Sequence, residues 1–246
     1  METVGEVIRV LDKGSIQLVD FMGSDQGVVR AARVSHKSSG DDEKDKRLIA
    51  YLWEHRHTTP FEHSVMTWHV KCPILVMRQW IRHRMSSYNE TSFRYREVPD
   101  EFYYPEQWRL QDTKNKQGSM PAPALEHRYY STELAKDCEH AMAKYKEMIA
   151  VGIAREMARM VIPVNVYTEF YWTVNAHAFL HFIGLRSESH AQWETRQYSD
   201  AMWGVFESVM PWTAKAFLCS INKRDPAAYP GINNQDAVAR RIAEAT

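Results

Sequence analysis

A regular run of apolar residues in the second half of the chain constrains the fold more than any other sequence feature. The run comprises Tyr130, Leu134, Cys138, Ala141, Tyr145 and Met148, at intervals of four, four, three, four and three residues. This spacing places the side chains on one face of a long helix and forms a seam for packing against other elements. The fold must therefore bury one long helix, which we expect to end before Pro163.

Shorter segments have the composition of strands. Residues 64–70 and 167–174 are rich in β-branched and aromatic side chains, and residues 7–10 and 16–21 predict a β-hairpin. Further helices are predicted over 25–34, 48–55, 73–85, from Asn175 as N-cap to 185, and from about 191. Because strands and helices do not alternate as βαβ units, we predict a helix-rich α+β fold. It has a small, mainly antiparallel sheet in a single domain and is not a Rossmann fold.

Two local expectations concern helix ends and faces. Thr59-Pro60-Phe61-Glu62 has the pattern of a capping box, with Thr59 at the N-cap, although it could simply begin a turn of helix. The helix from Pro73 is expected to face the core with Ile74, Met77, Ile81 and Met85. Ser86, Ser87, Asn89, Thr91 and Ser92 then predict a loop rich in hydrogen-bond donors.

Length and charge restrict the class of protein. The chain has 246 residues, 44% of them hydrophobic, and 31 basic against 31 acidic side chains. We expect one domain over 1–221 and a peripheral extension over 222–246. Neutrality argues against a coat for nucleic acid or a membrane surface. The stretch 170–185 is shorter than the ~20 residues of a spanning helix, and residues 1–14 lack the apolar stretch of a signal peptide. Three scattered cysteines fit a reducing cytoplasm.

The segment 78–96 breaks this neutrality. It contains five arginines and one acid, Glu90, and therefore carries a local charge of +4. Guanidinium groups beside hydroxyl and amide donors suit a phosphate or pyrophosphate, since such bonds can be bidentate. The alternatives are a solvated basic face and a nucleic-acid-binding segment in which the interleaved aromatic residues stack on bases.

Other candidate residues lie further along the chain. Arg155 and Arg159 are four residues apart among apolar neighbours, so they predict either a ligand site or a core salt bridge with Glu156 or another acid. Arg186 at a helix end could serve only as a cap. His177 and His181 have a spacing that can bind metal, which would suit a metal-dependent hydrolase, but no HExxH pattern accompanies them. We predict no metal site.

The segment 82–94 has the order Arg-His-Arg-x-x-Ser-x-Asn-Glu-x-Ser-x-Arg. It resembles, at every fixed position, the signature of the flavin-dependent thymidylate synthases. Further similarity covers nearly the whole chain, in AARVS at 31–35, HTTPFEH at 57–63, RQW at 78–80, AREMAR at 154–159, TVN at 173–175 and LRSESHAQWE at 185–194. The resemblance implies a helix-rich α+β homotetramer whose active sites are shared between subunits.

The implied reaction converts dUMP to dTMP. Methylenetetrahydrofolate supplies the carbon, FAD reduced by NADPH supplies the hydride, and tetrahydrofolate leaves. The positions matching FAD contacts are Ser35, His57, Thr59, Arg82, His83, Arg84, Glu90, Asn175, His177 and His181. Those matching dUMP contacts are Gln79, Arg82, Glu90, Thr91, Ser92, Phe93, Arg94, Arg159 and Arg186.

Individual roles follow from the same resemblance. Arg94 and Arg159 would face the phosphate and ribose, and Arg186 would act catalytically by stabilising charge on the uracil. His177 and His181 stand where some relatives carry arginine and asparagine, and Phe93 replaces a smaller residue. We interpret Ser92 as a hydrogen-bond donor because no base adjoins it in sequence, and Cys72 as buried packing.

Overall fold

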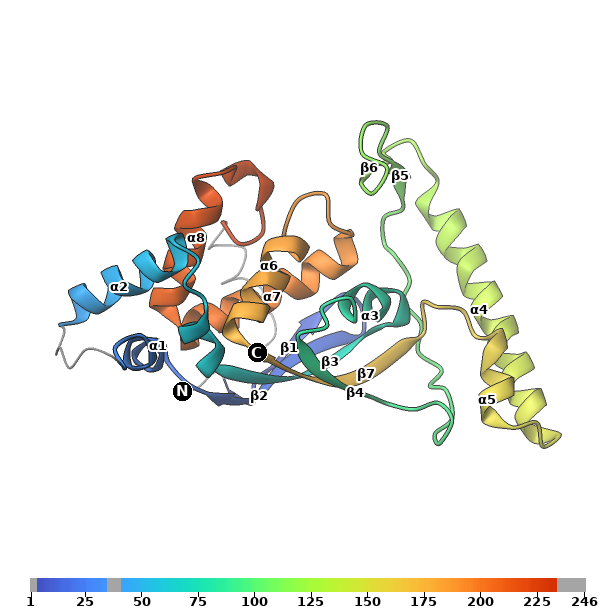
Figure 1. Ribbon diagram of the computed structural model, residues 1–246. Helices are drawn as coiled ribbons and strands as arrows, with labels where there is room; N and C mark the ends of the chain where they lie inside the picture. Colours follow the sequence, from blue (N-terminus) through green and yellow to red (C-terminus); the bar gives the residue numbers. More distant parts are fainter. Residues whose placement is uncertain (1–3, 35–40, 234–246) are drawn as a thin grey trace.

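The computed structural model describes residues 4–34 and 41–233, so Ser35 lies outside the described residues. Its main element is a five-stranded antiparallel sheet in the order β1-β2-β3-β7-β4 (Figure 1). The strands are β1 (Val7–Val10), β2 (Gly14–Met22), β3 (Val65–Pro73), β4 (Ser86–Glu90) and β7 (Tyr167–Asn175). A separate hairpin pairs β5 (Arg109–Gln111) with β6 (Ser119–Pro121). The predicted α+β class and the hairpin at 7–21 are confirmed.

Helices account for most of the remaining regular structure. They are α1 (Asp25–Ala32), α2 (Asp42–Glu54), α3 (Ile74–Trp80), α4 (His127–Ala150), α5 (Arg155–Ala158), α6 (Ala176–Arg186), α7 (Trp193–Val209) and α8 (Pro211–Asn222). Three short 3₁₀ turns are η1 (Thr59–His63), η2 (Arg159–Val161) and η3 (Pro226–Ala228). Ser24 caps α1 and Asn175 caps α6, each accepting a backbone N–H with its side chain, as predicted.

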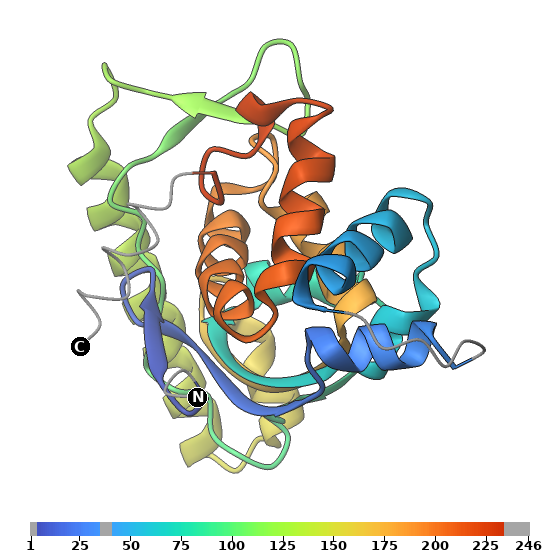
Figure 2. The same cartoon turned by 90° about the vertical axis from the view of Figure 1, so that its left-hand side faces the viewer.

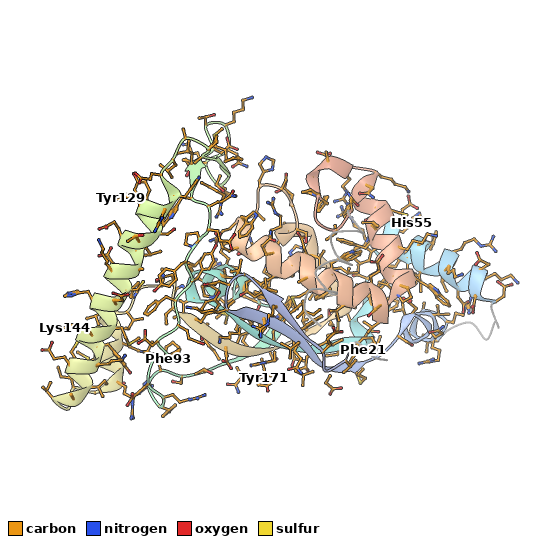
Figure 3. All side chains as sticks on the ribbon, turned by 180° about the vertical axis from the view of Figure 1, so that it is seen from behind. Phe21, His55, Phe93, Tyr129, Lys144 and Tyr171 are labelled. Atoms are coloured by element: carbon orange, nitrogen blue, oxygen red, sulfur yellow. The ribbon has the colours of Figure 1, made fainter. Side chains whose placement is uncertain are left out.

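One face of the sheet is covered by helices and the other is open. Alternate residues of β3 and β7, among them Trp68 and Trp172, are fully buried against α3, α6 and α7. On the opposite face, Tyr171 points away from those helices (Figure 3) and is 48% exposed. The core therefore lies between the sheet and one layer of helices.

A second, smaller core lies to one side of the sheet, under α4 (Figure 1). Cys138, Met142 and Tyr145 of α4 are buried there against Phe102 and Val166. The seam predicted for this helix is thus correct at its centre, whereas Tyr130 at its start is 44% exposed. The helix ends at Ala150, well before Pro163.

Several local predictions are wrong. Thr58, not Thr59, precedes η1, and its side chain caps nothing, so there is no capping box. α3 ends at Trp80, which leaves Ile81 and Met85 44% and 81% exposed, although we expected both in the core. The expected loop after α3 is in part the strand β4, because its backbone pairs with β7.

The segment expected to be peripheral from residue 222 packs on the core as far as it is described. Ile232 is 1% exposed and belongs to the main cluster. The Tyr229 hydroxyl donates to the carbonyl of Gly184 at 3.1 Å, and Ser189 N–H donates to the carbonyl of Ala228 at 2.7 Å. Residues 222–233 therefore help to cover the C-terminal half of α6.

Candidate active site

Strand β4 divides the arginine-rich segment 78–96 into two groups. Ser86 pairs with Val174 and Glu90 with Phe170 of the antiparallel strand β7. Four residue steps along a strand separate the ends of β4 by roughly 13 Å. Arg82, His83 and Arg84 therefore lie at the end of β7 that leads into α6, whereas Arg94 lies at the opposite end, towards α5.

The first group is organised around Arg186, the last residue of α6. Its Nε–H donates to Nε2 of His83 at 3.0 Å, and its Nη2 donates to the carbonyl of Gln79 at 3.4 Å. The centroid of the His83 ring lies 5.8 Å from the centroid of the His181 ring, and His181 lies on α6. Arg186 is thus more than a helix cap, because it connects α6 to the end of α3.

The environment of this cluster keeps His83 neutral. Burial, with the positive charges of Arg186 and His181, lowers the pKa of His83 from 6.5 to about 4. An unprotonated Nε2 is what the contact requires, since the Arg186 Nε–H must donate to it. Burial also lowers the pKa of Arg186.

Gln79, an expected dUMP contact, is held by a residue distant in the sequence, just before α7. Its amide Nε2 donates to Oε1 of Gln192, the residue preceding α7. Gln192 lies within LRSESHAQWE, so the similarity of that motif was a signal, but sequence alone did not indicate its partner. Among the described contacts, Gln192 fixes the Gln79 side chain beside Arg186.

Glu90 and Thr91 lie where β4 ends. The Thr168 hydroxyl of β7 donates to Oε1 of Glu90 at 2.8 Å, which leaves the other carboxylate oxygen for a ligand. Thr91 N–H donates to the carbonyl of Glu169 at 2.8 Å and continues the strand pairing by one residue. Thr168 is a further positioning residue that the sequence did not reveal.

The second group contains Arg94 and Arg159, both exposed. Arg94 Nε donates to Oε2 of Glu156 at 3.0 Å. Of the two alternatives for Arg155 and Arg159, the core salt bridge with Glu156 is therefore wrong, because both arginines are exposed and Glu156 pairs with Arg94. The segment 151–157 is exposed because α5 is only four residues long, and Arg155 approaches Glu97 at 3.9 Å instead.

Phe93 and Ser92 lie in the loop that follows β4 and precedes Arg94. Phe93 is 8% exposed and packs in the second core beneath α4, between the sheet and α5 (Figure 3). It therefore anchors the loop whose neighbours Ser92 and Arg94 face outward. The Ser92 hydroxyl accepts from the Arg94 backbone N–H at 3.3 Å, and no described imidazole or carboxylate hydrogen bonds to it. Ser92 consequently lacks the base that a nucleophilic serine needs.

The described FAD positions expected from the sequence come from three parts of the chain: α6 with its N-cap, the start of η1, and the segment between α3 and the end of β4. Asn175, His177 and His181 follow α6, with the Asn175 side-chain oxygen occupied by the Ala178 N–H at 2.8 Å. His177 Nδ1 lies 3.5 Å from Oε1 of Glu62 in η1. His57 and Thr59, both exposed, flank the entry to η1.

The donor set at the start of β4 fits an anionic group. Arg82 and Arg84 are exposed, and in the described part of the chain neither forms an ion pair. Together with His83 they present guanidinium forks next to α6, a chemistry that suits a pyrophosphate. In one chain, however, these residues and Arg94 lie at opposite ends of β4.

Cys72 is fully buried in β3 and packs in the main core, as predicted. Burial, with the negative charge of Glu90, raises the pKa of its thiol well above the ordinary value. A thiol that resists ionisation is a poor nucleophile. Cys72 is therefore unsuited to covalent attack on a pyrimidine.

Residues 4–34 and 41–233 contain neither a metal site nor a membrane-spanning helix. No group of three or more His, Cys, Asp and Glu side chains there has the arrangement of a metal site. Within the same residues, no helix combines the length and the apolar character that crossing a bilayer requires.

The fold and the site define a class of protein: an α+β enzyme scaffold built on one five-stranded antiparallel sheet, with an arginine-rich surface for anionic ligands. The model of the thymidylate synthase complementing proteins matches residues 17–212. The flavin-dependent thymidylate synthase of Thermosipho africanus is 48% identical over 219 residues, covering 88% of this chain and 96% of its own. That of Thermotoga neapolitana is 46% identical over 219 residues, covering 89% and 97%.

A solved structure is similar as well. It is the UMP/dUMP methylase PolB of Streptomyces cacaoi bound with 5-Br dUMP, with a TM-score of 0.79, 35% identity, and coverage of 86% of this chain and 97% of that one. The chain belongs to the flavin-dependent thymidylate synthase family, also described as the thymidylate synthase complementing proteins.

Proposed function

We propose that this protein catalyses the reductive methylation of dUMP to dTMP. Methylenetetrahydrofolate is the carbon donor, NAD(P)H-reduced FAD is the hydride source, and tetrahydrofolate is released. The observation that carries the proposal is the guanidinium of Arg186, oriented by His83 and by the carbonyl of Gln79 beside the arginine-rich segment. The family and its dUMP-methylating structural neighbour support the same reaction.

The chain's own groups account for activation of the pyrimidine. Arg186 faces the N3–C4–O4 edge of the uracil and stabilises the negative charge that develops there when C5 becomes nucleophilic. Gln79, held by Gln192, and Glu90, held by Thr168, hydrogen bond to the base and sugar. Arg82, Thr91, Ser92 and the backbone at Phe93 complete the contacts with dUMP.

The nucleotide phosphate is bound by Arg94 and Arg159 at the other end of β4. Arg94 exchanges its ion pair with Glu156 for the phosphate. Exposed ion pairs contribute roughly 0–1 kcal/mol, so this exchange costs little. Arg159, exposed and without an ion-pair partner in the described residues, supplies a second cation.

FAD is held by the residues that line α6 and the start of β4. Arg82, His83 and Arg84 bind its phosphates, and Asn175, His177, His181, His57, Thr59, Glu90 and Ser35 contact the rest. When bound, FAD supplies the hydride that completes the methyl group. The fit rests on the guanidinium groups of Arg82 and Arg84, which form no ion pair in the described residues, and on the amide nitrogen of Asn175, whose oxygen caps α6.

We further propose a homotetramer with active sites shared between subunits. The separation of the two arginine groups by β4 supports this arrangement, because one chain does not bring them around a single nucleotide. A reducing cytoplasm suits the protein, since its three cysteines are free.

The test is direct. The purified oligomer should be yellow and should bleach with NADPH, and equilibrium dialysis should show retention of both FAD and dUMP. Conversion of dUMP to dTMP should require methylenetetrahydrofolate. A colourless, folded oligomer that retains neither ligand would refute the proposal. Tight binding of single-stranded nucleic acid, or stoichiometric metal at His177 and His181, would support the two rival functions instead.

A further inference from the structure

A groove of about 1210 Å³ lies between α2, α6 and α8. α2 and α8 run side by side at this face of the molecule (Figure 2), and the exposed side of α6 forms the floor. Pockets for drug-sized ligands usually have volumes of about 300–1,000 Å³. The groove is therefore large enough for a dinucleotide, and none of the expected dUMP contacts lines it.

The groove has an excess of positive charge in a neutral chain. Its two acids, Glu43 and Glu54, are already paired with Lys46 and Lys223, each at 2.7 Å. Four further cations line it: Arg47, Arg56, Lys215 and Arg224. None of these four forms an ion pair with a carboxylate in the described residues. Such uncompensated cations around a concave surface attract anionic ligands.

Arg56 provides a second, independent observation. Its N–H donates to the carbonyl of Trp53 at 3.1 Å, and His57 N–H donates to the carbonyl of Leu52 at 2.8 Å. These two bonds form a Schellman motif that ends α2, in which glycine is the usual residue at the position of Arg56. Arg56 has φ 58°, a left-handed conformation shared by only one other non-glycine residue, Leu11, in the described chain.

An arginine in this conformation carries backbone strain that glycine would not. Residues with strain of this kind cluster at active sites and ligand-binding sites. The Arg56 side chain lines the groove. The motif thus places a guanidinium in the lining of the groove at some cost to stability.

The position of the groove relative to the flavin residues indicates its ligand. His177 and His181 of α6 line the floor of the groove, whereas Arg82, His83, Arg84 and Glu90 lie outside the groove. The groove therefore adjoins the proposed FAD site without containing most of it. A pyridine nucleotide must reach the flavin to reduce it, and it carries an adenosine diphosphate group as FAD does.

We infer that the groove between α2, α6 and α8 binds the phosphate groups of the pyridine nucleotide that reduces the flavin. Arg56, Lys215 and Arg224 bind the phosphates. Trp212, whose ring centroid lies 5.5 Å from Nζ of Lys46, offers a surface for the adenine. The inference rests on the proposed function, because only a flavoenzyme of this kind has such a reductant.

The experiment measures binding of NADP⁺ to the flavin-loaded oligomer by isothermal titration calorimetry. The variants are Arg56→Gly and Lys215→Glu. The matched control is Arg128→Glu, which alters an exposed arginine of α4 outside the groove. We expect Arg56→Gly to weaken NADP⁺ binding about five- to tenfold, the loss typical of one charge-assisted contact. Lys215→Glu should weaken it at least as much, and Arg128→Glu should leave it unchanged.

Two other readouts separate this role from a structural one. FAD content per subunit should equal that of the wild type in both groove variants. The melting temperature of Arg56→Gly should rise, since glycine relieves the left-handed strain. Loss of FAD from the variants would assign the groove to the flavin and overturn the inference, as would unchanged NADP⁺ affinity. If the wild type itself retains no FAD, the proposed function fails first, and that outcome is distinguishable.

Discussion

Arg186 and His83, 103 residues apart in the chain, are joined by a hydrogen bond of 3.0 Å between the guanidinium Nε and the imidazole Nε2. One residue ends α6 and the other lies between α3 and β4. The contact holds the guanidinium in place before any substrate arrives. Electrostatic stabilisation of a transition state depends on this kind of prior orientation.

Arg186→Ala should retain FAD while losing most dTMP formation. The loss should be roughly 10²- to 10³-fold in kcat, the range for removal of one donor that stabilises developing charge. Arg186→Lys should recover only part of it, because an ammonium lacks the planar fork. Flavin absorbance and single-turnover rates measure the two effects. Turnover near the wild-type level in Arg186→Ala would show that the role assigned to this residue is wrong.

His83→Ala and His83→Gln test the positioning of Arg186. Glutamine can still accept a hydrogen bond from the guanidinium, whereas alanine cannot. We expect His83→Ala to lower kcat about tenfold or more, with a smaller change in KM for dUMP, and His83→Gln to recover part of kcat. Steady-state kinetics with saturating FAD would show the split. Equal losses in both variants, in parallel with loss of FAD, would mean that His83 serves the flavin alone.

The stability of the protein should depend on the protonation of His83. Its pKa is about 4 in the folded state and 6.5 when unperturbed, so between these values the unfolded chain binds a proton that the folded chain does not. The free energy of unfolding should therefore fall as pH drops from about 6.5 to about 4. Because His83 is only half-buried, we expect on the order of 1–2 kcal/mol after allowing for solvent screening.

Chemical denaturation of wild type and His83→Gln across this pH range isolates the contribution of His83. Glutamine does not titrate, so the difference between the two proteins should grow in favour of the variant as the pH falls. A pH-independent difference would contradict the assigned pKa.

Cys72→Ala should remain active. The buried thiol has a raised pKa and no route to a substrate. The substitution should cost about 1 kcal/mol of stability, since it leaves a small cavity in the main core. Denaturant melts and dTMP assays at matched concentration test both parts. A folded but inactive Cys72→Ala protein would indicate a cysteine mechanism.

Much of the fold could be predicted from periodicity and capping. Asn175 and Ser24 cap helices because each follows an extended segment and precedes an apolar one, and these signals are local. The end of α3 at Trp80 was not predictable in the same way. The apolar pattern continues through Ile81 to Met85, but pairing of β4 with β7 overrides it, and strand pairing is a non-local event.

For the site, too, local sequence signals could be interpreted, whereas contacts between distant elements could not be predicted. The motif at 82–94 gave the candidate ligand-binding residues, yet sequence could not show that β4 separates Arg82 from Arg94. Nor could it pair Gln79 with Gln192 or Arg94 with Glu156, because each pair joins elements more than 60 residues apart. The left-handed Arg56 gave no sequence signal, since the motif it occupies ordinarily contains glycine.

The Glu156 carboxylate on Arg94 has a consequence for how substrate arrives. Without this ion pair, the Arg94 side chain would sample several rotamers and bind counter-ions from the solvent. Because the Glu156 carboxylate already pairs with Arg94, the Arg94 side chain stays extended. An incoming phosphomonoester then replaces one anion, the carboxylate, with another. Binding of the phosphate by Arg94 is then an exchange of one ion pair for another. Its rate is less sensitive to ionic strength than binding to an unpaired guanidinium would be.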